Sequence, residues 1–585
     1  MLRLPGVGNA RALAVTVAVA IVIDAALAIA FDWCVPVEIA SSQEKSALLA
    51  EVARDYNASA PRVSGRCVRV TVTRRASGEV EETLARGWDP KLDGEPPVVW
   101  SPAAKTWTIL LRQHRAARGL SDLLPPNLPT LMQSPLVIAM PQEMAVALGY
   151  PERALGWSDI LSLARDPAGW GSVKHAEWGA FRLGKTNPTI STSGLHALVS
   201  TYFAAAGVER PLVEADLTSP ATVAYVRDVE SAVVHYGESV STFLENLLDA
   251  DRRGASLTFA SAIAMAEKEV RDYNNGDPTS TGIAGVGPKV PLRAIYPKEG
   301  TLMADHPYAI LNAPWVDDIE REAAGAFLSY LLGPAVQARF AAAGFRDHAG
   351  TPGPEINAAN GLNPLEPRRV ILPPDGPVLE RMQRSWSDLR KRAHLLIAID
   401  VSRPMGEALV PGGETKLALA KQAASATLEQ LAVDDDVGIW VFGQASTEAP
   451  YRELAPIAPL ASRREQLRAL IADLSPSTQQ TPLFATTRIG VRFLGERFDP
   501  RRINAVMLLT TGRNEDPRDV DRQGLLRELQ SQAEEKFVRV FAVTYGPSAD
   551  AESMRLIAKA SRGAVYPATD PKTIGRVITN ILSNF

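Results

Sequence analysis

Along most of this chain, a buried strand, a hydroxyl-rich turn and an amphipathic helix follow one another repeatedly. Residues 37–57, "VEIASSQEKSALLAEVARDYN", show the order: a β-branched strand runs into two serines and then into apolar residues at helical spacing. Residues 96–113 and 179–207 repeat it. Alternating strands and helices predict α/β layers built on parallel sheets. Because 585 residues exceed what one hydrophobic core accommodates, we expect several such units.

The N-terminus carries an apolar run at residues 13–31, "LAVTVAVAIVIDAALAIAF". Its length is about that of a helix that crosses a bilayer. Arg3 and Arg11 precede the run while Asp32 and Glu38 follow it, so the positive-inside bias places the bulk of the chain outside the cytoplasm. We favour a single-pass anchor in the cell membrane, because the run is longer than a typical signal-peptide core. A cleaved signal peptide stays open as the alternative, since "ALAIA" offers small residues at cleavage spacing.

The chain has two cysteines, Cys34 and Cys67, and each opens a strand-like run, "CVPVEIA" and "CVRVTVT". If these strands are parallel neighbours joined by a crossover helix, both cysteines lie at the same end of adjacent strands, within bridging distance. An exported chain meets an oxidising compartment, which favours a disulfide over two free thiols. We therefore predict a bridge between them.

Two strand-rich stretches, residues 133–141 and 290–311, look like points at which the chain passes between two lobes. Together with the α/β repeats of residues 35–350, they resemble exported solute-binding proteins of the two-lobed kind, related to the molybdate and phosphate binders. The resemblance implies a periplasmic-binding-protein-like fold with a ligand cleft between the lobes. It implies these boundaries: lobe 1 at about residues 34–133 and 306–350, and lobe 2 at about residues 134–305.

The same resemblance implies that hydroxyl groups at strand-to-helix turns line the cleft. Helix N-termini at such turns present unsatisfied N–H groups and a partial positive charge, so the physics of the fold favours an anionic solute there. The alternative is that these hydroxyls only cap their own helices. The predicted ligand-binding residues are Ser41, Ser42, Ser101, Thr189, Ser191, Thr192, Ser193 and, from the return crossing, Tyr296.

Residues 351–392 are predicted to be a linker, dense in Pro, Gly and Asn, followed by a short amphipathic helix. From residue 393 to 585 the strand–helix alternation resumes and predicts a doubly wound, Rossmann-like sheet. The layout and motifs of this part resemble a von Willebrand factor A domain. The elements expected are strands at 395–400, 437–443, 505–511 and 537–546, helices at 414–432, 461–474 and 482–497, and two closing helices.

In that family a metal-ion-dependent adhesion site is built from an Asp-x-Ser-x-Ser loop, a threonine and a later aspartate. The resemblance implies Asp400, Ser402 and Thr481 as metal ligands, with Mg²⁺ as the ion that such oxygen ligands hold. Two positions depart from the pattern: Pro404 replaces the second serine and Thr511 replaces the later aspartate. Losing a hydroxyl and a carboxylate lowers the affinity for Mg²⁺. The alternative is a strand end whose side chains satisfy only local backbone groups.

Composition argues against some classes of function. A net charge of −4 with interspersed acids and bases provides no basic surface for nucleic acid. Ser42 and Lys45 fit a Ser-x-x-Lys spacing, but the partner motifs of penicillin-recognising enzymes are missing, so we expect no catalysis. The acidic run at 434–436 is predicted to be a solvated turn.

The sequence thus predicts a membrane-anchored, extracytoplasmic binding protein. We expect a small solute between two lobes, a protein partner at the C-terminal domain, and lobe closure that alters what this domain presents. The alternative is a structural or adhesion protein whose lobes serve only as scaffold, which a cleft filled by side chains would favour.

Overall fold

The computed structural model describes residues 34–237, 239–443, 449–533, 536–546 and 549–569, with Val577, Ile581 and Asn584. The apolar run at 13–31, and with it the predicted anchor or signal peptide, lies outside the described residues. Within the described part, every helix is too short or too polar to cross a bilayer.

Lobe 1 is built on a mixed sheet with strand order β10-β4-β1-β3-β2, in which β1 runs parallel to β3 and β4 and the edge strands β10 and β2 pair antiparallel. β1 begins directly after Cys34, and β1 and β4 each end at a serine. The strands are β1 (Val35–Ser41), β2 (Arg62–Val63), β3 (Arg66–Arg74), β4 (Val99–Ser101) and β10 (Ala309–Ile310). The helices are α2 (Gln43–Ala58), α3 (Ser77–Arg86), α4 (Pro90–Asp93), α5 (Lys105–Ala117), α14 (Asp318–Leu331) and α15 (Pro334–Ala342).

Lobe 2 holds a sheet of order β6-β7-β5-β8, with β9 pairing β5 as the chain returns to lobe 1. Both predicted crossing stretches thus contain strands of this sheet. The strands are β5 (Ser134–Pro141), β6 (Leu183–Gly184), β7 (Ala262–Ala266), β8 (Leu292–Ile295) and β9 (Met303–Ala304). The helices are α6 (Gln142–Ala147), α7 (Trp157–Arg165), α8 (Thr192–Ala206), α9 (Glu214–Thr218), α10 (Pro220–Ser231), α11 (Val240–Arg252), α12 (Ser256–Phe259) and α13 (Glu267–Asn274).

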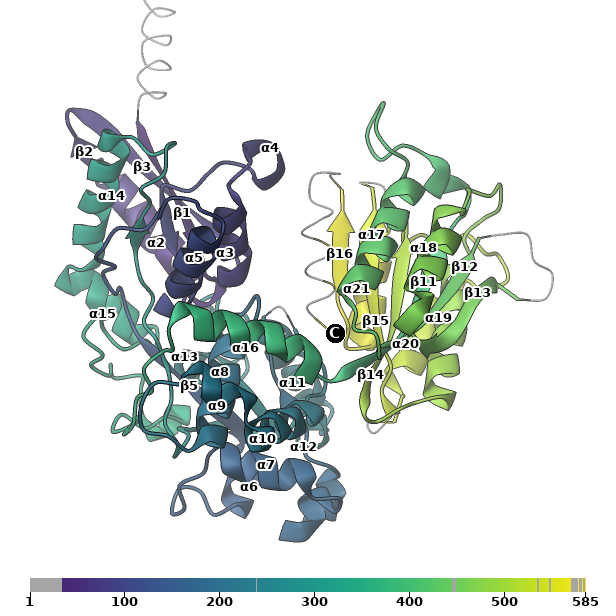
Figure 1. Ribbon diagram of the computed structural model, residues 1–585, viewed down its shortest axis with the longest axis horizontal. Coiled ribbons are helices and arrows are strands. Elements are labelled where there is room, and N and C mark those ends of the chain that lie inside the picture. Colours follow the sequence, from purple (N-terminus) through teal and green to yellow (C-terminus); the bar gives the residue numbers. More distant parts are fainter. Residues whose placement is uncertain are drawn as a thin grey trace, which may run out of the picture.

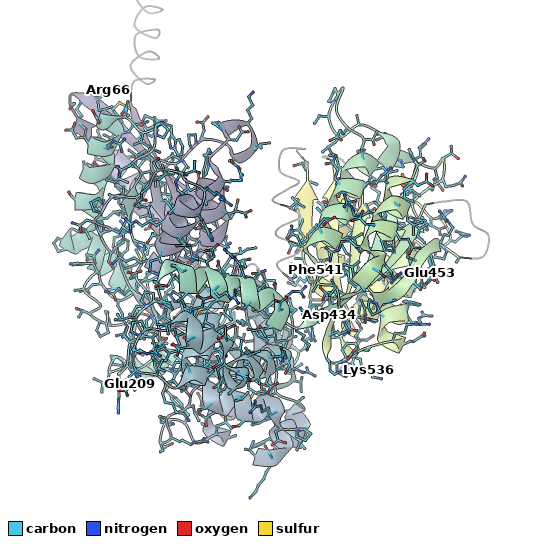
Figure 2. The ribbon with its side chains drawn as sticks, viewed as in Figure 1. Arg66, Glu209, Asp434, Glu453, Lys536 and Phe541 are labelled. Atoms are coloured by element: carbon cyan, nitrogen blue, oxygen red, sulfur yellow. A yellow bond between two sulfur atoms is a disulfide. The ribbon has the colours of Figure 1, made fainter. Side chains whose placement is uncertain are left out.

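The predicted disulfide between Cys34 and Cys67 is confirmed. β1 and β3 pair in parallel with Val35 opposite Val68, so the two cysteines stand side by side at the start of neighbouring strands. Figure 2 shows the bridge close to Arg66 at the end of lobe 1. The bridge closes the loop that contains α2, so it restricts the unfolded chain at this edge of the sheet.

Replacing both cysteines with serine is expected to lower the free energy of unfolding by about 3–4 kcal/mol, because the open chain regains loop entropy. Denaturant titration of the oxidised protein and the Cys34→Ser/Cys67→Ser variant measures the difference. As a control, reduction with dithiothreitol should bring the wild-type midpoint to that of the variant. An unchanged midpoint after removal of both thiols contradicts the assigned role.

The predicted linker packs against both lobes. Ile356, Leu362 and Ile371 are buried, so the Pro- and Gly-rich segment lies along the lobes. It leads into α16 (Gly376–Leu389), which lies across the junction between α5 of lobe 1 and α8 of lobe 2 before the chain enters the C-terminal unit (Figure 1).

The C-terminal unit is the predicted doubly wound sheet, with strand order β13-β12-β11-β14-β15-β16. Its central strands β11 and β14 are buried on both faces, which explains their continuous apolar runs. The strands are β11 (Arg392–Asp400), β12 (Asp436–Phe442), β13 (Tyr451–Pro459), β14 (Arg502–Thr510), β15 (Arg539–Tyr545) and β16 (Val565–Ala568). The helices are α17 (Lys416–Gln430), α18 (Arg464–Ala472), α19 (Leu483–Glu496), α20 (Arg522–Gln530) and α21 (Ala551–Ala560).

The acidic run at 434–436 forms the predicted turn before a strand, but it is only partly solvated. Asp435 is fully buried and forms an ion pair with Arg390, which lies at the end of α16. It also accepts a hydrogen bond from the backbone N–H of Ala393. This carboxylate therefore anchors the connector helix to the first strand of the C-terminal unit.

Candidate functional site: the cleft between the lobes

Five of the described helices begin at a cavity between the two lobes that has about 60 Å³ of space open to water-sized molecules. Lobe 1 contributes the first residues of two of these helices and lobe 2 those of the other three, so backbone N–H groups approach the cavity from both sides. The helices that begin there are α2, α3, α8, α11 and α13.

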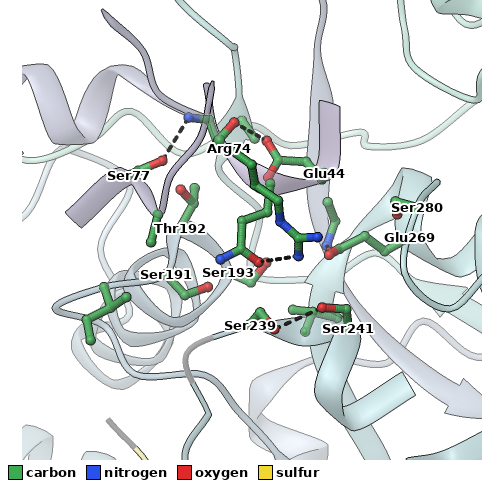
Figure 3. A pocket seen from close by; sticks show the side chains of 18 of the residues that line it. Glu44, Arg74, Ser77, Ser191, Thr192, Ser193, Ser239, Ser241, Glu269 and Ser280 are labelled. Carbon is green, nitrogen blue, oxygen red and sulfur yellow. Dashed lines mark hydrogen bonds between the residues drawn. The ribbon is translucent and has the colours of Figure 1, made fainter. Parts of the chain in front are cut away.

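Serine residues stand at the N-caps of three of these helices, Ser42, Ser191 and Ser239, and none of the three side chains caps its own helix. Instead Ser191 Oγ accepts from Thr186 at 2.9 Å, and Ser239 Oγ shares a hydrogen bond with Ser241 Oγ at 2.9 Å. The helix N–H groups thus keep their hydrogen-bonding capacity towards the cavity. Hydroxyl groups surround them, as Figure 3 shows for Ser77, Ser193 and others.

Four of the eight predicted ligand-binding residues line the cavity: Ser42, Ser191, Thr192 and Ser193. The other four lie outside its lining, and each hydroxyl donates to a neighbouring protein oxygen. Their hydrogen bonds run from Ser41 to the carbonyl of Ser42, from Ser101 to the carbonyl of Pro307, from Thr189 to Asn187, and from Tyr296 to Glu267.

The Ser42 hydroxyl is held by charged neighbours on both sides. It accepts a hydrogen bond from Lys45 Nζ and donates one to Glu44 Oε1. Lys45 Nζ also donates to the carbonyls of Ser101 and Pro102, at 2.8 and 3.2 Å, so its three N–H donors are all engaged. Burial lowers the pKa of Lys45 to about 8, and at neutral pH the group remains an ammonium.

Several lining residues were missed by sequence reasoning, and four of them, Glu44, Arg74, Glu269 and His306, carry ionisable side chains. Arg74 follows the end of a predicted strand, where a basic residue is unremarkable. Glu269 lies in the first turn of α13, and burial raises its pKa to about 8. His306 lies on the return crossing and is fully buried, which lowers its pKa well below the ordinary value.

The region that forms this cleft matches a known protein family. The family model for bacterial extracellular solute-binding proteins matches residues 37–346, just over half of the chain. This chain belongs to that family. The model for von Willebrand factor type A domains matches residues 394–580, so a C-terminal A domain follows the solute-binding region.

The chain is also similar to one curated relative and, in its separate parts, to solved structures. Uncharacterized protein Rv1836c of Mycobacterium tuberculosis is 24% identical over 523 residues, covering 88% of this chain and 71% of that protein. The sulfate-binding protein SubI of M. tuberculosis is 15% identical, covering 53% of this chain and 86% of SubI, with a TM-score of 0.35. A von Willebrand factor type A structure from Catenulispora acidiphila is 19% identical, covering 33% and 42% of the two chains, with a TM-score of 0.28.

In the A domain, the three residues predicted as metal ligands lie together as a closed hydrogen-bonded set. Asp400, Ser402 and Thr481 are all fully buried. The Asp400 carboxylate accepts from the Ser402 backbone at 2.9 Å and from the Thr510 hydroxyl at 2.7 Å, and Thr481 donates to the Ser402 hydroxyl at 2.7 Å. Burial raises the pKa of Asp400 to about 6.

This set does not fit a Mg²⁺ site. Both oxygens of its one carboxylate accept hydrogen bonds from protein donors, and all three side chains are buried, whereas Mg²⁺ needs several accessible oxygen ligands. In the described part of the chain, no cluster of three or more His, Cys, Asp or Glu side chains is arranged to hold a metal ion. Thr511, at the position of the later aspartate, places a hydroxyl and no carboxylate there.

Adding Mg²⁺ is therefore expected to leave the thermal midpoint of the A domain unchanged, because an ion that does not bind cannot stabilise the fold. Differential scanning calorimetry with Mg²⁺ or with EDTA measures the effect. The variant Pro404→Ser/Thr511→Asp, which restores the family pattern, is the matched comparison. A rise in the wild-type midpoint with Mg²⁺ would show that the set opens to bind the ion.

Proposed function

We propose that this protein binds a small solute with an anionic group between its two lobes, outside the cytoplasm, and contacts a protein partner through its A domain. The N-terminal apolar run holds it in the cell membrane. Solute-binding proteins bind small molecules and A domains mediate protein interactions, so each part keeps the activity of its family.

The convergence of five helix N-termini on one cavity carries this proposal. Each N-terminus carries about half a positive charge, which favours an anion, and the N-cap serines of α2, α8 and α11 leave the first N–H groups of these helices uncapped. Arg74 adds a full positive charge, and it forms no ion pair with any described residue. Hydroxyls, which donate without carrying charge, complete the lining. Charged and hydroxyl-bearing side chains from both lobes line the same cavity, which favours solute binding over the scaffold alternative.

The same site is poorly arranged for catalysis. A serine nucleophile needs a base that accepts its proton, yet Lys45 donates to Ser42 and has all three N–H groups engaged. Ser42 in turn donates to Glu44. We therefore propose that Ser42 and Lys45 position the first turn of α2 and perform no acyl transfer.

Two helices connect the cleft to the A domain, which supports the proposed coupling of solute binding to partner binding. α11 begins at the cleft, and near its other end Asp249 pairs with Lys559 of α21 at 2.9 Å. α16 bonds to both lobes: Glu380 accepts from Gln113 of lobe 1 at 3.0 Å, and Gln383 donates to the carbonyl of Pro188 in lobe 2 at 2.9 Å. A change in lobe angle must strain one set of these contacts.

Isothermal titration calorimetry of the purified protein against sulfate, phosphate, ethyl phosphate, propionate and amino acids tests the proposal. We expect saturable binding of at least one compound that has an anionic group. Absence of heat from all of them, with the protein folded, favours the scaffold alternative.

A further inference from the structure

Two carboxylates from opposite lobes line the cavity that the proposed function assigns to an anionic solute. Glu44 lies in the first turn of α2 in lobe 1, and Glu269 lies in the first turn of α13 in lobe 2. Glu269 Oε2 accepts from the backbone N–H of Ala266 at 2.8 Å, while its Oε1 accepts no hydrogen bond from the described residues. An anion alone would face the Glu44 carboxylate unfavourably and would gain no charge pair from Glu269.

His306 is a second, independent sign of a ligand near these carboxylates. Its side chain is fully buried in the cavity lining, and neither ring nitrogen has a hydrogen-bond partner among the described residues. Its Nδ1 lies 3.4 Å from Glu44 Oε1 without a hydrogen-bonding geometry. The backbone has a φ of 38°, which a non-glycine residue rarely adopts and which functional sites often contain.

The cavity lining also contains a positively charged side chain, that of Arg74. Arg74 donates to Gln43 at 3.0 Å, and Figure 3 shows its side chain reaching across the cavity towards Glu269. Arg74 and Glu269 nevertheless form no ion pair. The guanidinium of Arg74 and the carboxyl group of Glu269 therefore remain apart while lining the same small space.

We propose, building on the proposed function, that the solute is a zwitterion whose ammonium group lies between Glu44 and Glu269 and whose anionic group faces Arg74 and the helix N-termini. Such a solute compensates both charges, which a simple anion or cation cannot do. Three N–H donors of a primary ammonium match Glu44, Glu269 and the free imidazole acceptor of His306. The described lining contains no Phe, Tyr or Trp, so it offers no aromatic cage for a quaternary ammonium.

Protonation of Glu269 gives the zwitterion a distinct pH dependence. Burial raises the pKa of Glu269 to about 8, and Glu44 and Asp272 act in the same direction while Lys268 opposes them. Arg74 and His306 also face the cavity. In the empty cleft Glu269 is protonated below pH 8, whereas the ammonium binds its ionised form. Affinity for a zwitterion should therefore increase as the pH rises to about 8, with release of a proton.

The test is calorimetric titration of the full protein with matched probes that differ in one amine. β-Alanine is compared with propionate, and O-phosphoethanolamine with ethyl phosphate. We expect at least one zwitterion to bind at least about tenfold more tightly than its amine-free analogue. One charge pair that becomes buried on binding contributes about that difference in affinity. Glu269→Gln and Glu44→Gln should each abolish this preference. Glu209→Gln, at an exposed surface of lobe 2 (Figure 2), should retain it.

The outcomes separate this inference from the function on which it rests. The zwitterion proposal is overturned if both amine-free analogues bind as tightly as the zwitterions. It is also overturned if the preference for the zwitterion survives in folded Glu269→Gln and Glu44→Gln proteins. In both cases the proposed binding of an anion stands. If none of the four probes and none of the amino acids binds, the zwitterion proposal is overturned, and sulfate and phosphate then decide the proposed function separately.

Discussion

Replacing Glu230 with glutamine is expected to lower the free energy of unfolding by about 3–5 kcal/mol, because it leaves the charge of Lys185 buried without its partner. Both side chains are fully buried and form an ion pair in lobe 2. Glu230 also accepts from Tyr236 at 2.6 Å and from Trp386 of the connector helix α16 at 3.3 Å. The substitution therefore weakens lobe 2 and its attachment to α16 together. Denaturant unfolding followed by tryptophan fluorescence measures the loss.

Two further variants make this prediction specific. Lys185→Met combined with Glu230→Gln removes the unpaired charge and should recover part of the stability. Glu465→Gln changes an exposed glutamate on the A domain and should leave stability unchanged. A loss below about 1 kcal/mol in Glu230→Gln would place the pair among weak, solvent-screened ion pairs and contradict its burial.

Replacing Arg74 with glutamine is expected to weaken solute binding by about tenfold, which corresponds to the loss of one charge pair at a solvent-exposed position of the lining. Arg74 is the cation that lines the cavity from the end of β3, and its guanidinium is not committed to an ion pair among the described residues. Its removal should leave the fold intact, because its one described side-chain hydrogen bond is to Gln43. Calorimetric titration with the tightest solute of the panel measures the change.

The matched control is Arg368→Gln, which alters a mostly exposed arginine away from the cleft and should preserve the affinity. Equal affinity of the Arg74→Gln and wild-type proteins would mean that the anionic group lies elsewhere. Unfolding midpoints of both variants confirm that any loss reflects the site and not the fold.

The strands and helices that could be predicted from sequence are those whose burial leaves a periodic pattern. The sequences of β11 and β14 contain continuous apolar runs, and those of α2 and α17 have apolar residues at helical spacing. β13 was missed because it is an antiparallel edge strand with two prolines and mixed exposure, which resembles a loop in sequence. β16 and α20 are short and were likewise missed.

The residues of the site could likewise be predicted from sequence only where the signal lies next to them in the chain. Ser42 and Ser191 could be predicted because a serine before an amphipathic helix marks a helix start at a sheet edge. Glu269 and His306 could not, because their role arises only when residues from opposite lobes meet, and nothing adjacent to them in sequence indicates a cavity. Asp435 shows the converse error: three consecutive acidic residues suggest solvent, yet a partner brought by α16 buries one of them.

A crystal structure of the protein with its tightest solute tests the central account most directly. We predict density for the solute between the lobes, with its anionic group within hydrogen-bonding distance of Arg74 and of backbone N–H groups at the starts of α2, α8 and α11. Solute density outside this cavity, or a cavity closed by side chains while the solute binds elsewhere, would contradict it.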